Sequence, residues 1–479
     1  MAVLKPYLEY RDSGVPWLGE VPKNWKVQKL RIIMKGVTER NRPDLPLLSV
    51  VREKGVILRD ITEKGENRNF IPDDLSNYKV VREGQFVMNK MKAWQGSYGV
   101  SRYNGIVSPA YFVFDIHLVE GSYFHSAIRS KAYVPLFTQA SDGVRIGQWD
   151  LSQVRMKEIP FFIPSLAEQS AIVRFLDHMD RRIRRYILAK QRLIKLLEEY
   201  KQVIIHRAVT RGLDPTVPLK PSGVEWLGDV PEHWEVQKFR HLVLPVAGIQ
   251  MGPFGSSLTQ LQVFDTGFKL FGQENTISGD FQRGSRWLTE PQFIKLQRYE
   301  ICKGDLVLTR KGSIGKCRMV PHDAPVGIAD SDTIRVRISE EKLSRRFAVM
   351  LLHFSAYLQF QIHSLQRGAV LGGLNTATIA ELRIAVPPAS EQDRIVEEIE
   401  SKTSELDRSI FNVKREIALL REYRTRLISD VVTGKLDVQG IELPADKDAE
   451  VPTELNEHLE DDITPDDCEI PEEIPAEAD

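Results

Sequence analysis

A heptad pattern of apolar residues occupies the middle of the chain, between Ser165 and Gly212. Apolar side chains recur there at steps of four and three residues, which is typical of a helix that packs along another helix. The predicted seam is Ile172, Leu176, Met179, Ile183, Tyr186, Leu193, Leu197, Tyr200 and Ile204, with one polar interruption at Lys190. A Ser-x-x-Glu capping box at Ser165 and Glu168 predicts where the helix begins, and Gly212 predicts where it ends. Such a helix would be roughly 68 Å long at 1.5 Å per residue, so we expect it to separate two parts of the molecule and to pair with another helix.

The predicted partner helix lies in the same chain. A shift of 223 residues places Glu168 and Gln169 on Glu391 and Gln392, and the two segments then align without a gap to Asp437. The second segment has its own seam, formed by Ile399, Thr403, Leu406, Ile410, Val413, Ile417, Leu420, Arg424, Leu427 and Val431. A heptad can also mediate oligomerisation through another chain. The internal copy of equal length favours an antiparallel pair within one chain.

A second repeat shows that more than the helix is duplicated. The segment SGVPWLGEVPKNWKVQKLR, from Ser13 to Arg31, recurs as SGVEWLGDVPEHWEVQKFR, from Ser222 to Arg240, with 13 of 19 positions identical. The distance between the copies is too long for a solenoid unit and indicates a duplicated domain together with its helix. The repeated tryptophans are Trp17, Trp25, Trp226 and Trp234. They could stack on bases, but their place beside Pro22 and Pro231 favours packing at a domain edge.

The segments between repeat and helix, roughly 32–163 and 241–387, are predicted to contain short mixed strands, Gly, Asn and Asp turns and a few short helices. In each, a strand leads into a polar loop with glycine, at residues 83–103 and 303–320. The side chains differ between the halves but combine cations for phosphate with amides and guanidiniums for base edges. The alternative for any single residue is an exposed loop side chain without a ligand. The candidate DNA contacts are Asn89, Lys90, Lys92, Gln95, Arg102, Arg145 and Gln148 in the first half, and Ser256, Ser257, Gln273, Asn275, Arg310, Lys311, Ser313, Lys316, Arg318, Arg367 and Asn375 in the second.

The formal net charge of −1 hides a division between a basic body and an acidic tail. Residues 440–479 hold 16 acidic residues and one lysine, whereas residues 1–439 hold 64 basic and 50 acidic residues. A segment so charged, with five prolines and few aromatic residues, is predicted to be disordered. It could serve solubility alone, or it could fold back on the basic body and compete with a polyanion.

The sequence contains no motif of a catalytic or cofactor-binding site. The glycines at Gly312 and Gly315 do not form a phosphate-binding loop, no Gly-x-Gly-x-x-Gly opens a helix after a strand, and the ten histidines have no metal-ligand spacing. Three cysteines without paired spacing argue against structural zinc and are typical of a reducing compartment. We find no apolar run of membrane-spanning length and no signal-peptide core, so we expect a soluble, cytoplasmic protein.

The repeated SGVxWLGxVPxxW, the Pro-x-x-x-Glu-Gln segments at Pro164–Gln169 and Pro387–Gln392 and the two polar loops resemble the DNA specificity subunit of type I restriction-modification systems, over residues 7 to about 437. The resemblance implies an α+β protein in which two target recognition domains with pseudo-twofold symmetry each precede a long helix, and the two helices form an antiparallel coiled coil. The expected division is residues 1–163 for recognition domain 1, 164–213 for the central helix, 214–387 for recognition domain 2, 388–437 for the C-terminal helix and 438–479 for the acidic tail.

The resemblance also implies a function and partners. Each domain would read one part of a split, asymmetric site in double-stranded DNA. Two modification subunits with S-adenosylmethionine would methylate adenine, and two restriction subunits that use ATP and magnesium would cleave; this chain would hold no cofactor and no metal and would not be an enzyme. The alternatives are a stand-alone DNA-modifying enzyme, which requires a cofactor or metal motif, and a coiled-coil scaffold for proteins, for which the basic body has no purpose.

Overall fold

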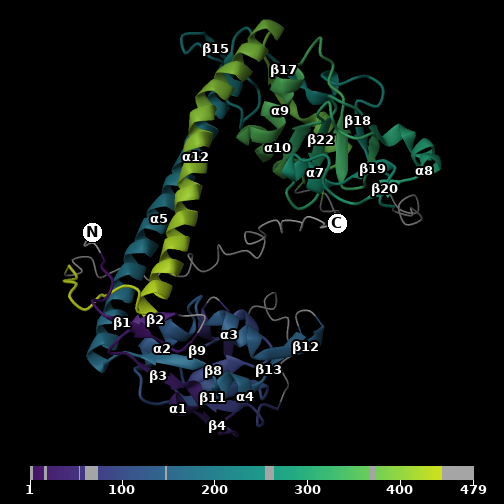
Figure 1. Cartoon of the computed structure of the whole chain (residues 1–479). Helices are drawn as coiled ribbons and strands as arrows, with labels where there is room; N and C mark the ends of the chain where they lie inside the picture. Colours follow the sequence, from purple (N-terminus) through teal and green to yellow (C-terminus); the bar gives the residue numbers. More distant parts are fainter. Residues whose placement is uncertain are drawn as a thin grey trace, which may run out of the picture. The chain divides into compact units, whose positions relative to one another are not determined.

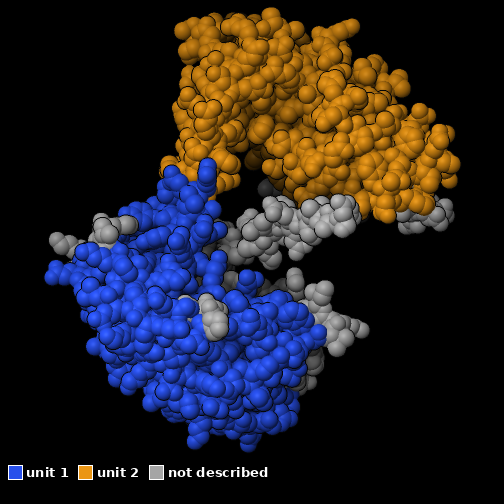
Figure 2. Space-filling model, viewed as in Figure 1, with its two compact units in different colours: residues 1–191, 415–479 blue, residues 192–414 orange. Residues whose placement is uncertain are grey.

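The computed structural model describes residues 4–15, 19–52, 54–59, 74–145, 148–253, 264–366 and 373–444. The chain divides into two compact units, of which unit 1 comprises residues 1–191 and 415–479 and unit 2 comprises residues 192–414. Both boundaries fall within the two long helices of the chain, α5 (Leu166–Arg211) and α12 (Ala389–Val432) (Figures 1 and 2). Each unit therefore contains part of both helices and one globular segment. The mixed α and β structure agrees with the fold class predicted from the sequence.

Unit 1 is built from short antiparallel strands covered by short helices. Its strands are β1 (Tyr10–Asp12), β2 (Glu20–Pro22), β3 (Lys26–Lys29), β4 (Met34–Val37), β5 (Leu48–Val51), β6 (Gly55–Leu58), β7 (Lys79–Val81), β8 (Phe86–Asn89), β9 (Tyr98–Val100), β10 (Gly105–Val107), β11 (Tyr111–Ile116), β12 (Ser141–Arg145), β13 (Gln148–Leu151) and β14 (Pro160–Ile163). Its short helices are α1 (Leu30–Ile33), η1 (Ala93–Gln95), α2 (Gly121–Ile128), α3 (Val134–Gln139) and α4 (Gln153–Lys157).

Unit 2 repeats this construction and adds a second four-stranded sheet. Its strands are β15 (Leu219–Pro221), β16 (Asp229–Pro231), β17 (Glu235–Lys238), β18 (Ile249–Met251), β19 (Phe268–Phe271), β20 (Trp287–Leu288), β21 (Glu300–Ile301), β22 (Leu306–Thr309), β23 (Cys317–Met319), β24 (Gly327–Ala329), β25 (Thr333–Val336) and β26 (Arg383–Val386). Its short helices are η2 (Phe239–His241), α7 (Gln273–Ser278), α8 (Glu290–Lys295), η3 (Gln297–Tyr299), α9 (Arg345–Phe354), α10 (Ala356–Gln366) and α11 (Thr376–Glu381).

Three sheets have the same connectivity in both units. The central sheet has the order β4-β11-β8-β9 in unit 1 and β18-β25-β22-β23 in unit 2. The strand that follows the repeated tryptophan segment pairs with the last strand before the long helix, as β3 with β14 and as β17 with β26. The hairpin-like pairs β1-β2 and β15-β16 also correspond. The duplication read from the sequence is therefore a duplication of topology.

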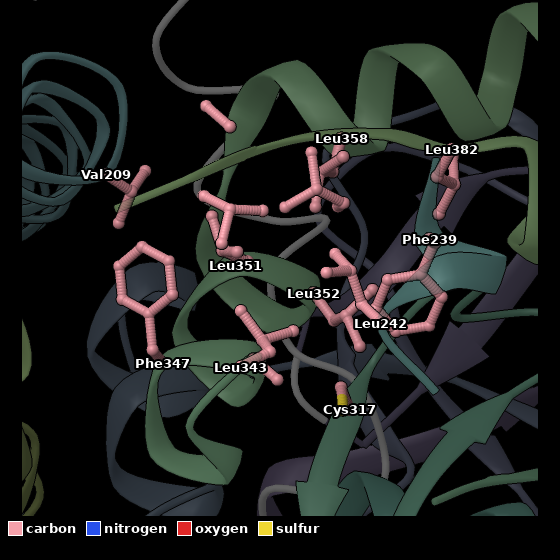
Figure 3. Close-up of a cluster of buried hydrophobic side chains, with 14 of the residues drawn as sticks. Val209, Phe239, Leu242, Cys317, Leu343, Phe347, Leu351, Leu352, Leu358 and Leu382 are labelled. Atoms are coloured by element: carbon pink, nitrogen blue, oxygen red, sulfur yellow. The ribbon is translucent and has the colours of Figure 1, made fainter. Parts of the chain in front are cut away.

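Each unit has its own hydrophobic core, which includes residues of the long helices. In unit 1 the aromatic side chains of Phe86, Phe124 and Phe161 pack with Leu176 of α5 and Val431 of α12. Figure 3 shows part of the core of unit 2, where Leu351 and Leu352 of α9 lie among Phe239 and Val209. The helix ends are thus held by burial of apolar surface in the unit that they enter.

The repeated Glu-Gln pair anchors the start of each long helix. The Trp25 indole N–H donates to Glu168 Oε1 at 2.8 Å, and the Trp234 indole N–H donates to Glu391 Oε2 at 3.1 Å. Trp25 is 1% and Trp234 0% exposed, so the domain-edge interpretation is confirmed for these two tryptophans. Trp226 is partly exposed beside Phe360, and Trp17 lies outside the described residues.

The following glutamine makes the same bonds in both units. The side-chain amide of Gln169 donates to Pro164 O, and that of Gln392 donates to Pro387 O, both at 2.9 Å. Their side-chain oxygens accept the backbone N–H of Glu120 and of Ser344 at the start of α2 and α9. The predicted capping box is only half correct, because Ser165 Oγ caps the Glu168 N–H but the Glu168 carboxylate turns inward to Trp25.

Within each unit, the helices α5 and α12 contact each other through ion pairs. Asp180 pairs with Arg424 in unit 1, and Lys201 pairs with Asp407 in unit 2 at 2.6 Å. Lys190, the polar interruption of the predicted seam, pairs with Glu416. As the residue number on α5 increases from one ion pair to the next, the number of its partner on α12 decreases. This is the order expected of antiparallel helices.

Burial on α12 follows the predicted positions, whereas burial on α5 differs from them. All ten predicted positions on α12 are buried or half-buried. On α5, Tyr186, Leu193 and Tyr200 are 51%, 42% and 57% exposed, and Ile187, Ile194 and Lys201 take the inner positions instead. Shifting the predicted α12 seam back by 223 residues gives these inner positions. Apolar character alone does not distinguish residues that face α12 from residues that face away from it.

Candidate nucleic-acid interface

In unit 1 the candidate site is the turn between β8 and β9, residues 90–97. The four residues of β8 are buried in the central sheet, which fixes where the turn begins. The 3-10 helix η1 forms the middle of the turn, and Gly96 ends it with φ of 92°, a conformation that favours glycine. Lys92 is exposed and Gln95 half-buried in this turn. The turn thus presents polar side chains from a rigid base.

A second segment, the hairpin β12-β13, is joined to this turn. The Leu151 N–H donates to Lys90 O at 3.2 Å, and Lys90 Nζ forms an ion pair with Asp150 Oδ2 at 2.5 Å. The rings of Trp94 and Trp149 lie 5.2 Å apart between the same two segments. Arg145 and Gln148 face each other in the hairpin register, although their side chains lie outside the described part of the chain.

In unit 2 the corresponding turn is residues 310–316, between β22 and β23. Gly312 and Gly315 have φ of 63° and 79°, and Thr309 Oγ1 accepts the Lys316 N–H at 3.0 Å. The Leu374 N–H donates to Arg310 O at 2.9 Å, which matches the bond between Leu151 and Lys90 in unit 1. The segment before α11 therefore lies beside this turn as the hairpin β12-β13 lies beside the turn of unit 1.

The loop of residues 330–332 connects the polar elements of unit 2. Lys311 Nζ lies 2.9 Å from Asp332 Oδ1, and the Arg310 N–H donates to Asp332 O at 3.0 Å. Arg286 bridges Asp330 and Glu274 at 3.0 and 2.8 Å, which links the loop to the start of α7. Burial raises the pKa of the Asp330 carboxyl, and Arg286 opposes that shift. This loop thus connects the predicted basic residues Arg310 and Lys311 with the start of α7, where the predicted Gln273 lies.

Four predicted contacts have their polar groups occupied within the protein. Asn89 is 9% exposed, and its amide donates to the Tyr111 hydroxyl at 3.2 Å. Asn275 is 1% exposed and bonds the backbone of Gly272, Asp280 and Arg283. Arg310 Nε donates to Leu374 O at 3.1 Å, and Asn375 Oδ1 caps α11 by accepting the Thr378 N–H. Burial leaves the amides of these two asparagines little exposed surface, and their assignment as DNA contacts stays a prediction.

The other predicted residues divide by position. Lys90, Lys311, Ser313 and Lys316 lie in or at the edge of the two turns. Arg102 is exposed but follows β9, at the end of the β8-β9 hairpin opposite the turn, so the structure does not bring it together with Lys92. Arg318 lies on β23 near Gly279 at the end of α7, and Gln273 is the first residue of α7. Ser256, Ser257 and Arg367 lie outside the described residues.

The sequence interpretation missed several residues at these surfaces. Trp94 and Trp149 join the two segments in unit 1, and Asp150 and Asp332 each bind a predicted lysine. The position of Trp149, directly after the predicted Gln148, was the available signal for unit 1. No local signal pointed to Asp332, because it lies 21 residues from its lysine.

The described residues form neither a candidate metal site nor a candidate membrane-spanning helix. Among them, no group of three or more His, Cys, Asp or Glu side chains is placed to hold a metal ion. Over the same ranges, none of the helices combines the length and apolar character required to cross a bilayer.

Comparison with known proteins identifies the class. The family described as the type I restriction modification DNA specificity domain matches residues 279–413. The chain is 25% identical over 285 residues to the specificity subunit of the type I restriction enzyme MjaVIII from Methanocaldococcus jannaschii, covering 58% of this chain and 62% of that protein. It is 21% identical over 346 residues to the StySPI specificity subunit from Salmonella potsdam, covering 71% of this chain and 68% of that protein.

A solved structure has a similar fold. It comes from a study of complex assembly and conformational transition of the type I R-M system, covers 87% of this chain and 99% of its own, and superposes with a TM-score of 0.61 at 15% identity. The matched segment is described as a DNA specificity domain, and the solved structure shares the fold of the chain. The chain is thus similar to type I restriction-modification specificity subunits, and its residues 279–413 match the specificity domain of that family. It spans somewhat less than two thirds of the length of the MjaVIII subunit.

Proposed function

We propose that this chain reads a split, asymmetric DNA sequence for a type I restriction-modification complex, with one reading surface in each unit. The observation that carries the proposal is the pair of matching turns, residues 90–97 and 310–316. Both follow a buried strand of the same central sheet, and both are bonded to the segment before the last short helix of the unit. Their side chains differ, as two readers of different sequences require.

The two long helices could act as a spacer that separates the two reading surfaces. In this proposal, residues 1–163 and 214–387 are target recognition domains related by a pseudo-twofold axis, and residues 164–213 and 388–437 form an antiparallel coiled coil. What supports it is the pattern of ion pairs between α5 and α12 in each unit, together with the repeated Glu-Gln anchors. The length of α5, 46 residues or roughly 69 Å, would limit the separation of the two half-sites to about 20 base pairs.

The outer face of α5 supports the docking of partner subunits around the helices. In unit 2, Leu193, Leu196, Tyr200 and Val203 are all exposed and recur at heptad spacing. The same shift of 223 residues relates Leu196 and Tyr200 to Leu419 and Tyr423, which are also exposed in unit 1. Both copies of the repeat therefore have an exposed leucine and an exposed tyrosine that are not buried within the chain. Each pair could bind one copy of the same partner protein. We assign them to two modification subunits, and we expect two restriction subunits to join the complex.

The chemistry of the complex is assigned to those partners. S-adenosylmethionine would serve adenine methylation, and ATP and magnesium would serve cleavage, each on a partner subunit. This chain would then contribute binding and positioning only, in the cytoplasm where the DNA lies. The acidic residues after 444 lie outside the described residues, so their predicted disorder and their competition with DNA both stay hypotheses.

A gel-shift and methyl-transfer experiment tests the proposal. The purified chain, with and without the modification subunit of its system, is mixed with pools of random duplex DNA. We expect no methyl transfer by the chain alone, and sequence-selective binding and adenine methylation with the modification subunit. Methyl transfer by the chain alone would favour a stand-alone enzyme. Absence of DNA binding in both mixtures would favour a protein scaffold.

A further inference from the structure

In each reading surface, a lysine and an aspartate from two different segments form an ion pair. In unit 1, Lys90 at the start of the turn pairs with Asp150 of β13 at 2.5 Å. In unit 2, Lys311 of the turn pairs with Asp332 of the loop before β25 at 2.9 Å. The two pairs do not occupy aligned positions in the repeat, since Lys90 corresponds to Arg310 by its backbone bond. The same combination of groups therefore arises from different residues.

The stability of the units does not explain these pairs. The side chains are 38% and 54% exposed in the first pair and 50% and 29% exposed in the second. Ion pairs so accessible to water contribute little to folding. The segments of unit 1 are already joined by the Leu151–Lys90 backbone bond, and the loop of unit 2 by the Arg310–Asp332 backbone bond. The charged groups of Lys90, Asp150 and Lys311 thus remain accessible to a ligand, whereas Asp332 Oδ1 is buried and also lies 3.8 Å from Arg310 Nη1.

A carboxylate is also a poor group for the DNA backbone. It repels phosphate, and it accepts hydrogen bonds but donates none. Its natural partner on DNA is an exocyclic amino group in the major groove, whereas a lysine donates to guanine O6 and N7. A carboxylate and an ammonium group that lie side by side complement a base pair with a hydrogen-bond donor at one end of its major-groove edge and acceptors at the other end.

Only a G·C pair has that order in the major groove. Cytosine N4 is the donor at one end, and guanine O6 and N7 are the neighbouring acceptors. In an A·T pair the adenine N6 donor lies between two acceptors, N7 and thymine O4, and both would repel a carboxylate that reaches N6. The paired charges are therefore selective for G·C and also for its orientation.

We propose that Lys90 with Asp150, and Lys311 with Asp332, each read one G·C pair, one in each half-site of the DNA. This inference rests on the proposed function and adds to it a base pair and the residues that select it. On binding, each ion pair opens toward the base pair, so that the carboxylate accepts from cytosine and the ammonium group donates to guanine.

The test is to map the methylated motif for the chain assembled with its modification subunits, as wild type and with Asp150→Asn or Asp332→Asn. Asparagine favours adenine, so each variant should lower the preference for one G·C pair on the order of 10- to 100-fold and raise acceptance of A·T there. Asp150→Asn should act in one half-site and Asp332→Asn in the other. Lys311→Gln should relax the same base pair as Asp332→Asn, which keeps the test valid if one variant does not fold.

Matched controls are available on other exposed ion pairs. Glu9→Gln breaks the pair with Lys23 in unit 1, and Glu381→Gln breaks the pair with Lys238 in unit 2, and neither lies at a reading turn. Both should leave the motif unchanged. The inference would be overturned by a wild-type motif in which a half-site lacks a G·C pair. It would also be overturned by Asp variants that leave the motif unchanged or that lose activity uniformly at all positions. A wild-type complex without any sequence preference would overturn the proposed function as well.

Discussion

Lengthening both long helices should lengthen the spacer between the two parts of the DNA site. The sites for insertion are after Lys190 on α5 and after Val413 on α12, which correspond in the 223-residue shift and lie beside the boundaries between the units. Four residues add about 6 Å to each helix, which equals about two base pairs at 3.4 Å. They also rotate the helix by about one turn and 40°, so the inner stripes still face each other.

The assay is to map methylated adenines in DNA from cells that express the variant with its partner subunits. We expect both half-sites to be unchanged and the unspecified spacer to grow by about two base pairs. A matched control inserts two residues at each place, which rotates the following seam by about 200° and should break the contact between α5 and α12. A four-residue variant that methylates the original motif with the original spacer would refute the helix-length reasoning.

Three further predictions concern other parts of the chain. Glu168→Ala leaves the buried Trp25 indole and the Tyr7 hydroxyl without their acceptor, so chemical denaturation should show a loss of about 2 to 4 kcal/mol, whereas Glu9→Ala on the surface should change little. Burial lowers the pKa of His125 and that of His353 to about 4 each, below the usual 6.5. Since the unfolded imidazoles gain protons first, stability should fall as pH drops from 6.5 toward 4, by about 2 kcal/mol per histidine, and less in His125→Gln and His353→Gln variants; a pH-independent unfolding free energy would contradict this. Leu196→Asp with Tyr200→Asp should lower the number of modification subunits per chain in native mass spectra without changing the melting temperature, with Glu199→Gln as control; an unchanged stoichiometry would argue against docking on this face.

The duplication was the most informative property of the sequence for the fold. It located both long helices to within a few residues and predicted two segments of equal pattern, which share one sheet order. The duplication also identifies the inner positions of α5, because the predicted seam of α12 shifted back by 223 residues falls on them. The direct heptad assignment instead included Tyr186, Leu193 and Tyr200, because their apolar character is the same whether they face α12 or another surface.

The positions of the two turns followed from the sequence, whereas the internal bonds of their side chains did not. The turns after β8 and β22 are located as expected, since a buried strand followed by glycine-containing polar residues is a local signal. The internal bonds of Asn89 and Arg310 depend on atoms supplied by other segments, namely by Tyr111 and Leu374, 22 and 64 residues away. A residue's type does not reveal such a bond. The polar character of each loop could therefore be predicted from the sequence, whereas the hydrogen-bond partner of each side chain could not.

The central claim is that two separate surfaces of this chain each define part of one DNA sequence. Determining the methylated motif of the wild-type complex tests it most directly. We expect two short defined sequences, different from each other and separated by an unspecified spacer of fixed length. A single continuous motif, or methylation without sequence preference, would contradict it.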